Sequence, residues 1–358
     1  MGDAERGIRS AWNRIQWHLE RGTVVRAVVI AAVLAFVLVA VPSLVSVYWV
    51  KVATAAAIFS IVALGLNLLF GRVGMVSLGQ IALLALGSWV AARLFFATGL
   101  PFPLVLLLGG LITGVLGTLI GLPALRLGGL YLALITLMLA GAISIVLTHV
   151  DFPNGGGGFL GHTEATVEYP DVRRPSIAEA DDAYFRYTVV VTVVMFLLGL
   201  AYVSSKTGRA WAAIRESEPA ALAAGVNITV YKLWAFALAS FMTGVAGGLL
   251  AANEGKLYAE QFPTIDSITL LAVVLMGGIF SLWGAVAAGL LGKLLPALLD
   301  DWGVSPDFVI ILFGIGILQV VVTAPGGLVD QVPKDLRRLG RLLARPLRRG
   351  ESPPEQSA

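Results

Sequence analysis

The chain has 358 residues, of which 58% are hydrophobic and 13% are charged, and its formal net charge is +3. Soluble domains carry roughly 25% charged residues, so this composition excludes an ordinary soluble protein and indicates helices that lie in lipid. The chain contains no cysteine, which excludes disulfides, thiol catalysis and cysteine-ligated metals.

The first 23 residues form a polar segment that contains several arginines. Its apolar side chains Ile8, Trp12, Ile15 and Leu19 recur at helical spacing. This pattern favours a cytoplasmic amphipathic helix that lies in the membrane interface. The alternative is a frayed polar tail.

Residues 24–325 form the predicted transmembrane domain, because they contain one apolar run after another. A spanning helix needs about 20 apolar residues. The last part, residues 265–323, divides into either two long spans or three short ones. With three, the candidate spans are 24–41, 51–70, 75–97, 103–124, 129–149, 185–204, 234–251, 265–282, 284–300 and 306–323.

The distribution of charge along the chain predicts the orientation. Lysine and arginine are enriched in cytoplasmic segments, so the arginine-containing leader is placed inside. The loop 150–184, which carries seven acidic residues, then lies outside, and the loop 205–233 lies inside. The basic tail 326–358 also belongs inside, against anionic lipid. Two cytoplasmic termini require an even number of spans, so we expect an all-α polytopic membrane protein with about ten transmembrane helices.

Glycines four residues apart recur in the predicted spans. The pairs are Gly110 with Gly114, Gly117 with Gly121, and Gly244 with Gly248. Small residues at this spacing let helix backbones approach closely in lipid. These pairs therefore predict faces at which helices contact one another.

The stretch GRVGMVSLGQ, residues 71–80, interrupts two apolar runs. Backbone groups freed by its glycines must find partners inside the protein or in water. The polar side chains Asn67, Ser77 and Gln80 surround this break, and Thr136 lies in the middle of a later span. We expect these four residues beside the substrate path. The alternative is a tight helical hairpin in which Ser77 and Gln80 satisfy the backbone and each other, while Thr136 bonds its own preceding turn.

The loop 205–233 is too polar to span a membrane and too long for a tight turn. Residues 209–224 have a helical pattern with charges of both signs, and Gly225 is placed to end that helix. Pro219 divides the pattern into two short helices. A rigid amphipathic element of this kind fits a groove on a partner protein. The alternative is a solvated loop.

Residue patterns typical of enzymes are missing. The three histidines lack metal-binding spacing, and neither a GxSxG elbow nor a GxxxxGK[ST] phosphate loop occurs. We therefore expect no catalytic residue, no metal site, no cofactor and no ATP bound by this chain, and no nucleic acid among its partners. The predicted spans also contain almost no carboxylates of the kind that ion-coupled transporters use.

Four stretches together resemble the LivM-type permease of branched-chain amino-acid ABC importers. They are GLNLLFGRVGMVSLGQIALLALGSWVAA, PALRLGGLYLALITLMLAGAI, GRAWAAIRESEPAALAAGVNITVYKLWAFALASFMTGVAGGL and MGGIFSLWGAVAAGLL. The resemblance covers about residues 50–328. It implies a permease subunit in the bacterial inner membrane that moves leucine, isoleucine or valine.

The resemblance also implies the partners. These are a second, LivH-like permease, two cytoplasmic subunits that bind ATP and Mg²⁺, and an external solute-binding protein. In this family the cytoplasmic loop seats on the ATPase, and Pro219 stands where the general motif has an acidic residue. The residues assigned to this contact are Arg209, Arg215, Glu216, Glu218, Ala220, Ala221 and Gly225.

Other functions remain open at this point. A urea or short-amide permease of the same architecture would change only the solute. An ion-coupled secondary transporter would work without ATPase subunits. A membrane enzyme would need a catalytic constellation that the sequence lacks.

Overall fold

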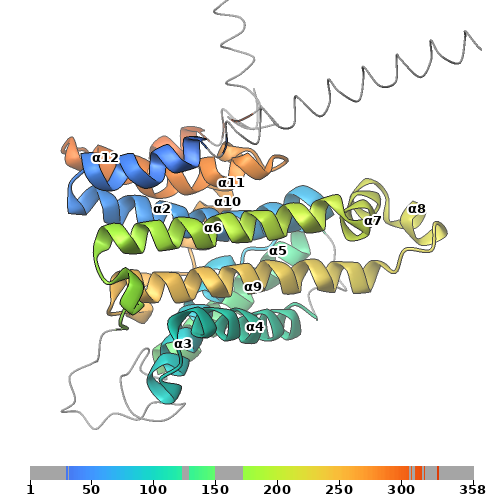
Figure 1. Ribbon diagram of the computed structural model, residues 1–358. Coiled ribbons are helices and arrows are strands. Elements are labelled where there is room, and N and C mark those ends of the chain that lie inside the picture. The colour runs from blue at the N-terminus through green and yellow to red at the C-terminus, as the bar shows by residue number, and fades with distance from the viewer. Residues whose placement is uncertain are drawn as a thin grey trace, which may run out of the picture. The chain divides into compact units, whose positions relative to one another are not determined.

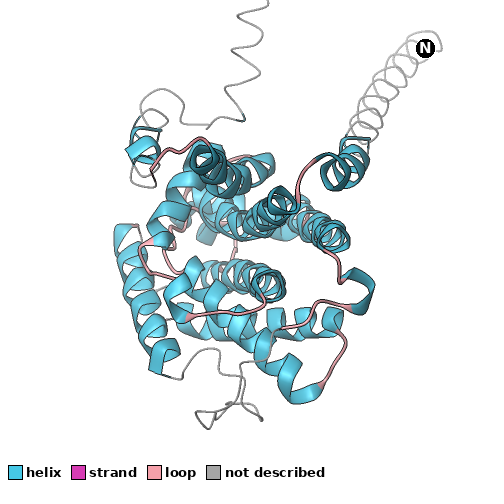
Figure 2. Ribbon diagram, turned by 90° about the vertical axis from the view of Figure 1, so that its left-hand side faces the viewer, coloured by secondary structure: helices cyan, strands magenta, loops and turns pink. Residues whose placement is uncertain are grey.

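The computed structural model describes residues 32–122, 129–149, 172–305 and 311–316, and the single residues 30, 308, 318 and 329. The predicted leader, nearly all of the basic tail and most of the predicted outer loop lie outside the described residues. The described part consists of helices and connecting loops, with no strand (Figure 2). The predicted all-α class is confirmed.

The chain divides into two compact units, residues 1–50 and 51–358. The first unit contains a short apolar helix, Ala32–Leu44. All the sites described below belong to the second unit.

Eight helices of the described part are long and apolar enough to cross a membrane. They match eight of the ten predicted spans, and the other two predicted spans are described only in part. The elements are α2 (Val47–Leu66), η1 (Asn67–Val73), α3 (Gln80–Thr98), α4 (Phe102–Gly121), α5 (Leu130–His149), η3 (Ser176–Ala178), α6 (Asp181–Ser204), α7 (Lys206–Glu216), α8 (Glu218–Ala223), α9 (Ile228–Glu254), η4 (Ala259–Gln261), α10 (Asp266–Gly277), α11 (Leu282–Gly289), η5 (Leu290–Leu294) and α12 (Leu295–Asp301).

Helix α9 is the central element of the second unit. It packs against α3 and α4, and Figure 1 shows it running beside α4 and α6. Its apolar residues are buried nearly all round, as expected of a helix surrounded by other helices.

Glycines make the close packing around α9 possible. A side chain at Gly117 of α4 would collide with Ser240, and one at Gly244 of α9 would collide with Thr113. The backbones of Gly87 and Gly244 touch, because a Cβ at Gly87 would lie 2.6 Å from the Gly244 Cα. The predicted glycine contact faces are confirmed.

Candidate functional site

The first break in the membrane helices follows α2. The helix widens into the π-helix η1 and ends at Gly74, whose φ of 83° closes the last turn. The Met75 N–H then donates to the Leu69 carbonyl at 3.0 Å. Residues 74–79 are not helical, and α3 begins only at Gln80. The predicted span 75–97 therefore starts five residues too early, because Gly74 turns the backbone out of the helix.

A second break lies between α10 and α11. Gly278 has a φ of 119°, and a short non-helical stretch leads to the start of α11 at Leu282. Both breaks share the pattern Gly-x-x-Ser-Leu, at residues 74–78 and 278–282. We call residues 74–79 and 278–281 the paired breaks.

The second break packs against the end of the helix that leads into the first. The Asn67 amide nitrogen donates to the Ser281 carbonyl at 2.8 Å and lies 3.4 Å from the Gly278 carbonyl. A Cβ at Gly71 would lie 2.0 Å from the Ile279 carbonyl oxygen, so only glycine fits there. Asn67 thus satisfies backbone groups that the second break leaves without helical partners.

The other predicted path residues surround the first break. The Thr136 hydroxyl accepts a hydrogen bond from the Leu78 N–H and donates one to the Ala133 carbonyl, both at 2.9 Å. The Ser77 oxygen lies 3.4 Å from the Gly79 N–H. The Gln80 carbonyl oxygen accepts from the Thr243 hydroxyl at 2.8 Å. Thr136 bonds its own preceding turn, as the alternative predicts, and Ser77 lies beside a backbone N–H of the break. Gln80 instead binds a side chain of α9. Contact between the four residues and a solute stays a prediction.

A narrow cleft lies beside the first break, between α3, α4, α5 and α9. Its lining includes Ser77, Thr136, Gly117, Gly121 and Phe236. Its space is about 300 Å³ including the part open to solvent, but only about 20 Å³ admits the centre of a water molecule. That is room for about one water. Passage of a solute along this cleft requires the surrounding helices to separate.

The predicted cytoplasmic loop forms two short helices, α7 and α8. Ser217 separates them and caps α8, with its hydroxyl 3.4 Å from the Ala220 N–H. Pro219 occupies the first turn of α8, where its missing N–H costs nothing. Gly225 ends the loop helices with a φ of 81°. The predicted division is confirmed, although α9 begins at Ile228, within the predicted loop.

The side chains assigned to the ATPase contact point in different directions. Glu216, Glu218 and Ala220 are exposed, while Ala221 is buried within this chain at 2% exposure. A bulky residue at position 221 would therefore disturb this chain's own packing.

Two of the assigned residues bind other parts of the chain. The Arg215 guanidinium donates to the Gly71 carbonyl, with 2.8 Å between nitrogen and oxygen. Glu218 forms an ion pair with Lys232 of α9 at 2.7 Å, and the Lys232 side chain is largely buried. Arg209 remains on its own helix, where a guanidinium nitrogen lies 3.5 Å from the Ser205 carbonyl.

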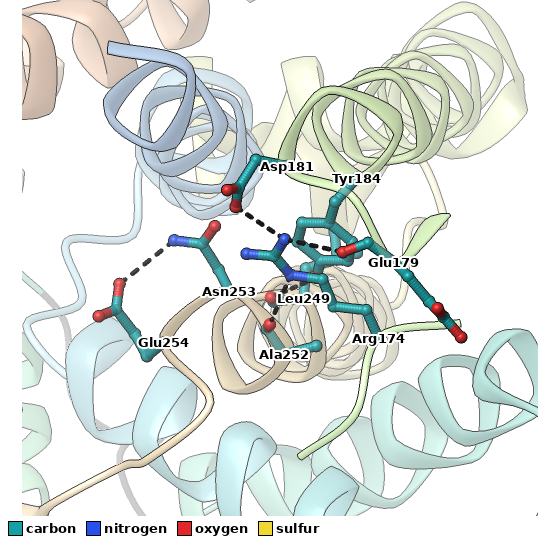
Figure 3. A network of polar contacts seen from close by, with 8 residues as sticks. All are labelled: Arg174, Glu179, Asp181, Tyr184, Leu249, Ala252, Asn253 and Glu254. Atoms are coloured by element: carbon teal, nitrogen blue, oxygen red, sulfur yellow. Dashed lines mark hydrogen bonds and ion pairs between the residues drawn. The ribbon is translucent and has the colours of Figure 1, made fainter. Parts of the chain in front are cut away.

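Sequence reasoning missed a polar cluster at the other end of α9 (Figure 3). The Arg174 guanidinium binds the Asp181 carboxylate at 2.7 Å and the Glu179 carbonyl at 3.2 Å. It also lies 3.3 Å from the Ala252 carbonyl in the last turn of α9 and 4.7 Å from the centre of the Tyr184 ring. A cation suits this position because helix C-termini carry partial negative charge. The run Arg173–Arg174 within an acidic loop was the available signal.

The structure offers no metal site in the part of the chain it describes. Among those residues, no three His, Asp or Glu side chains are grouped so that they could hold an ion.

Comparison with known proteins places the chain among transport permeases. The family model described as branched-chain amino acid transport system / permease component matches residues 48–321. The high-affinity branched-chain amino acid permease LivM of Salmonella typhimurium is 30% identical over 88% of this chain and 78% of its own length. LivM of Escherichia coli is 29% identical over the same shares. The fructose import permease FruG of Bifidobacterium longum is 25% identical over 73% of this chain and 77% of its own length. None of the solved structures matches the chain significantly.

Proposed function

Because the chain belongs to the family of branched-chain amino acid transport permease components, we propose that it imports leucine, isoleucine or valine as the permease subunit of an ATP-driven transporter. The observation that carries this proposal is the 30% identity to a LivM permease over 88% of the chain. The chain is a multi-pass membrane protein and a transport component, and its relatives are named as permeases, not as enzymes.

The proposed energy source is ATP bound with Mg²⁺ on two partner subunits in the cytoplasm. The short helices α7 and α8 would form their seat. An exposed leucine supports this role, since 60% of the Leu222 surface is accessible on α8. An open groove also lies between α8 and the start of α9, lined by Leu222, Val226 and Thr229 among others.

Two further partners are proposed, a second permease and a solute-binding protein. A probable LivH permease of Methanocaldococcus jannaschii is 26% identical to this chain, which supports pairing with a second, related permease. An external solute-binding protein would deliver the solute. We place the complex in the bacterial inner membrane with both termini in the cytoplasm.

Fructose is the second candidate solute, because permeases named for fructose import are related to this chain. An apolar pocket distinguishes single methylene groups by only ~1–3 kcal/mol. The buried hydroxyl and amide groups around the first break would suit a sugar as well as an amino acid.

The test is purification of the tagged chain from its native membrane, followed by reconstitution into vesicles. We expect two ATP-binding subunits and a second permease to accompany the chain. Uptake of radiolabelled leucine should then require ATP on the ATPase side and the cognate solute-binding protein. The chain isolated without these subunits, yet still active in uptake, would refute ATP-driven import and favour an ion-coupled transporter. Uptake of fructose in place of leucine would change the proposed solute but leave ATP-driven import in place.

A further inference from the structure

We propose that Arg215 is a positioning residue for transport, which connects the α7–α8 loop to the paired breaks. The proposal rests on the proposed function, because it takes the loop to be moved by ATP-hydrolysing partners. It adds the route by which that movement reaches the membrane helices.

Arg215 is a side chain of the loop that contacts both break regions. Its guanidinium nitrogen donates to the Gly71 carbonyl at 2.8 Å, just before the first break. Its guanidinium carbon lies 4.4 Å from the centre of the Phe280 ring, within the second break. The start of its side chain lies beside Gly74, where an added Cβ would be 3.4 Å from the Arg215 Cγ.

The two break regions already form one unit before Arg215 is considered. Asn67 bonds the Ser281 carbonyl, and Gly71 touches the Ile279 carbonyl. A residue that displaces one break therefore displaces the other. Packed elements of this kind change between discrete arrangements and do not deform continuously.

The chemistry of the contact calls for arginine. Gly71 lies in the last turn of η1, where carbonyls lack helical partners and favour a cation. A guanidinium can donate to that carbonyl in its plane while its face stacks on Phe280. The compact ammonium of a lysine has no planar face with which to do both.

The second helix of the loop is held by a different part of the chain. Glu218 at the start of α8 pairs with Lys232 of α9. On α7, the Trp211 indole N–H donates to the Tyr231 carbonyl at 2.9 Å. The loop is thus fixed to α9, and Arg215 links it to the paired breaks as well.

The experiment measures leucine transported per ATP hydrolysed by the complete complex in vesicles. Arg215→Gln should assemble and hydrolyse ATP, but lower this ratio by about tenfold, within the range typical of coupling between sites. Arg215→Lys should restore only part of it. Phe280→Leu should lower the ratio by about threefold because the cation–π contact is lost, whereas Phe280→Tyr keeps a ring and should retain the ratio.

A double variant tests whether the two contacts act as one. Arg215→Gln combined with Phe280→Leu should be no worse than Arg215→Gln alone, because residues in one contact are not additive. Lys206→Gln is the matched control, since it removes one exposed positive charge from the same helix. It should stay within about twofold of the parent.

Four results would overturn the proposal. The first is an Arg215→Gln complex with the parent ratio of leucine to ATP, and the second is an equal loss in Lys206→Gln. The third is full additivity in the double variant. The fourth result applies if Arg215→Gln fails to assemble. In that case, an equal ratio of leucine to ATP in Phe280→Leu and Phe280→Tyr would overturn the proposal. A parent chain that purifies without ATPase subunits refutes the proposed function itself, and the role of Arg215 falls with it.

Discussion

The hydroxyl groups of Thr118 and Thr136, in the successive helices α4 and α5, make different hydrogen bonds. Thr118 of α4 donates to the Gly114 carbonyl of its own preceding turn at 2.6 Å. Thr136 of α5 also donates to its own helix, but it additionally accepts the N–H of Leu78 from the first break. The Leu78 N–H is partly buried, so the loss of this bond leaves it with much of its desolvation penalty.

This difference predicts the outcome of one substitution at two sites. Thr136→Val should lower the free energy of unfolding by about 1–3 kcal/mol, since it strands the Leu78 N–H. Thr118→Val should change it by about 0.5 kcal/mol or less. Thermal unfolding of the two variants in the same detergent measures the difference. An equal change in the free energy of unfolding in the two variants would show that water replaces the hydrogen bond of Thr136 to the Leu78 N–H.

At this scale the sequence identifies residues but not their partners. Asn67, Ser77 and Gln80 were predictable as a polar group around a glycine-rich interruption. The partners of Asn67 and Gln80, which are Ser281 and Thr243, lie 214 and 163 residues away in the chain. No local pattern predicts contacts over that separation. The contact of Arg215 with Gly71 was missed for the same reason, because the two residues lie 144 positions apart in the chain.

Between elements, the packing of α3 on α9 depends on the absence of side chains. The contact between Gly87 and Gly244 involves backbone on both sides, which cannot rotate away as a flexible side chain can. Close backbone approach is a main source of helix association in lipid, where the hydrophobic effect does not drive helices together.

A single methyl group should therefore separate these helices. Gly87→Ala should lower the stability by about 1–3 kcal/mol through overpacking. Gly141→Ala on α5 is the matched control, because a Cβ there meets nothing within 4 Å, and alanine favours helix more than glycine does. The control should be neutral or slightly stabilising. A Gly87→Ala protein as stable as the control would contradict the close contact.

The elements themselves were largely predictable because each depends on local signals. Apolar length predicted α5 almost to the residue, and Pro219 with Gly225 predicted two helices in the loop. The start of α3 was predicted too early. The apolar pattern includes residues 75–79, but the backbone is not helical there. There the Leu78 N–H bonds a threonine from another helix instead of its own.

For the whole molecule, the two ends of α9 carry different polar structures. The α7–α8 loop adjoins its first turns through Lys232, and the Arg174 cluster adjoins its last. The proposed orientation places the first in the cytoplasm and the second outside. Both ends offer exposed side chains, Leu222 at 60% and Ile177 at 77%.

The orientation can be tested by cysteine labelling that is read on the purified chain, because the chain has no cysteine of its own. In intact cells, a membrane-impermeant maleimide should label Ile177→Cys and leave Leu222→Cys unlabelled. Opening the cells should expose Leu222→Cys. A tag after Ala358 should be accessible only in opened cells, as an even number of spans requires. The reverse labelling pattern would invert the proposed orientation.

Helix α9 has 27 residues, which is about 40 Å at the usual rise per residue. The hydrocarbon core of a bilayer is about 30 Å thick, so roughly two turns of an upright α9 lie beyond it. Lys232 and the Arg174 cluster lie near the two ends of this helix, and they stay outside the hydrocarbon only while the acyl chains are short enough. In lipids with longer tails, these charges would be drawn into hydrocarbon or the surrounding bilayer would have to thin. The length of the lipid acyl chains therefore affects the charged groups at both ends of α9. This effect comes from the bilayer and needs no partner protein.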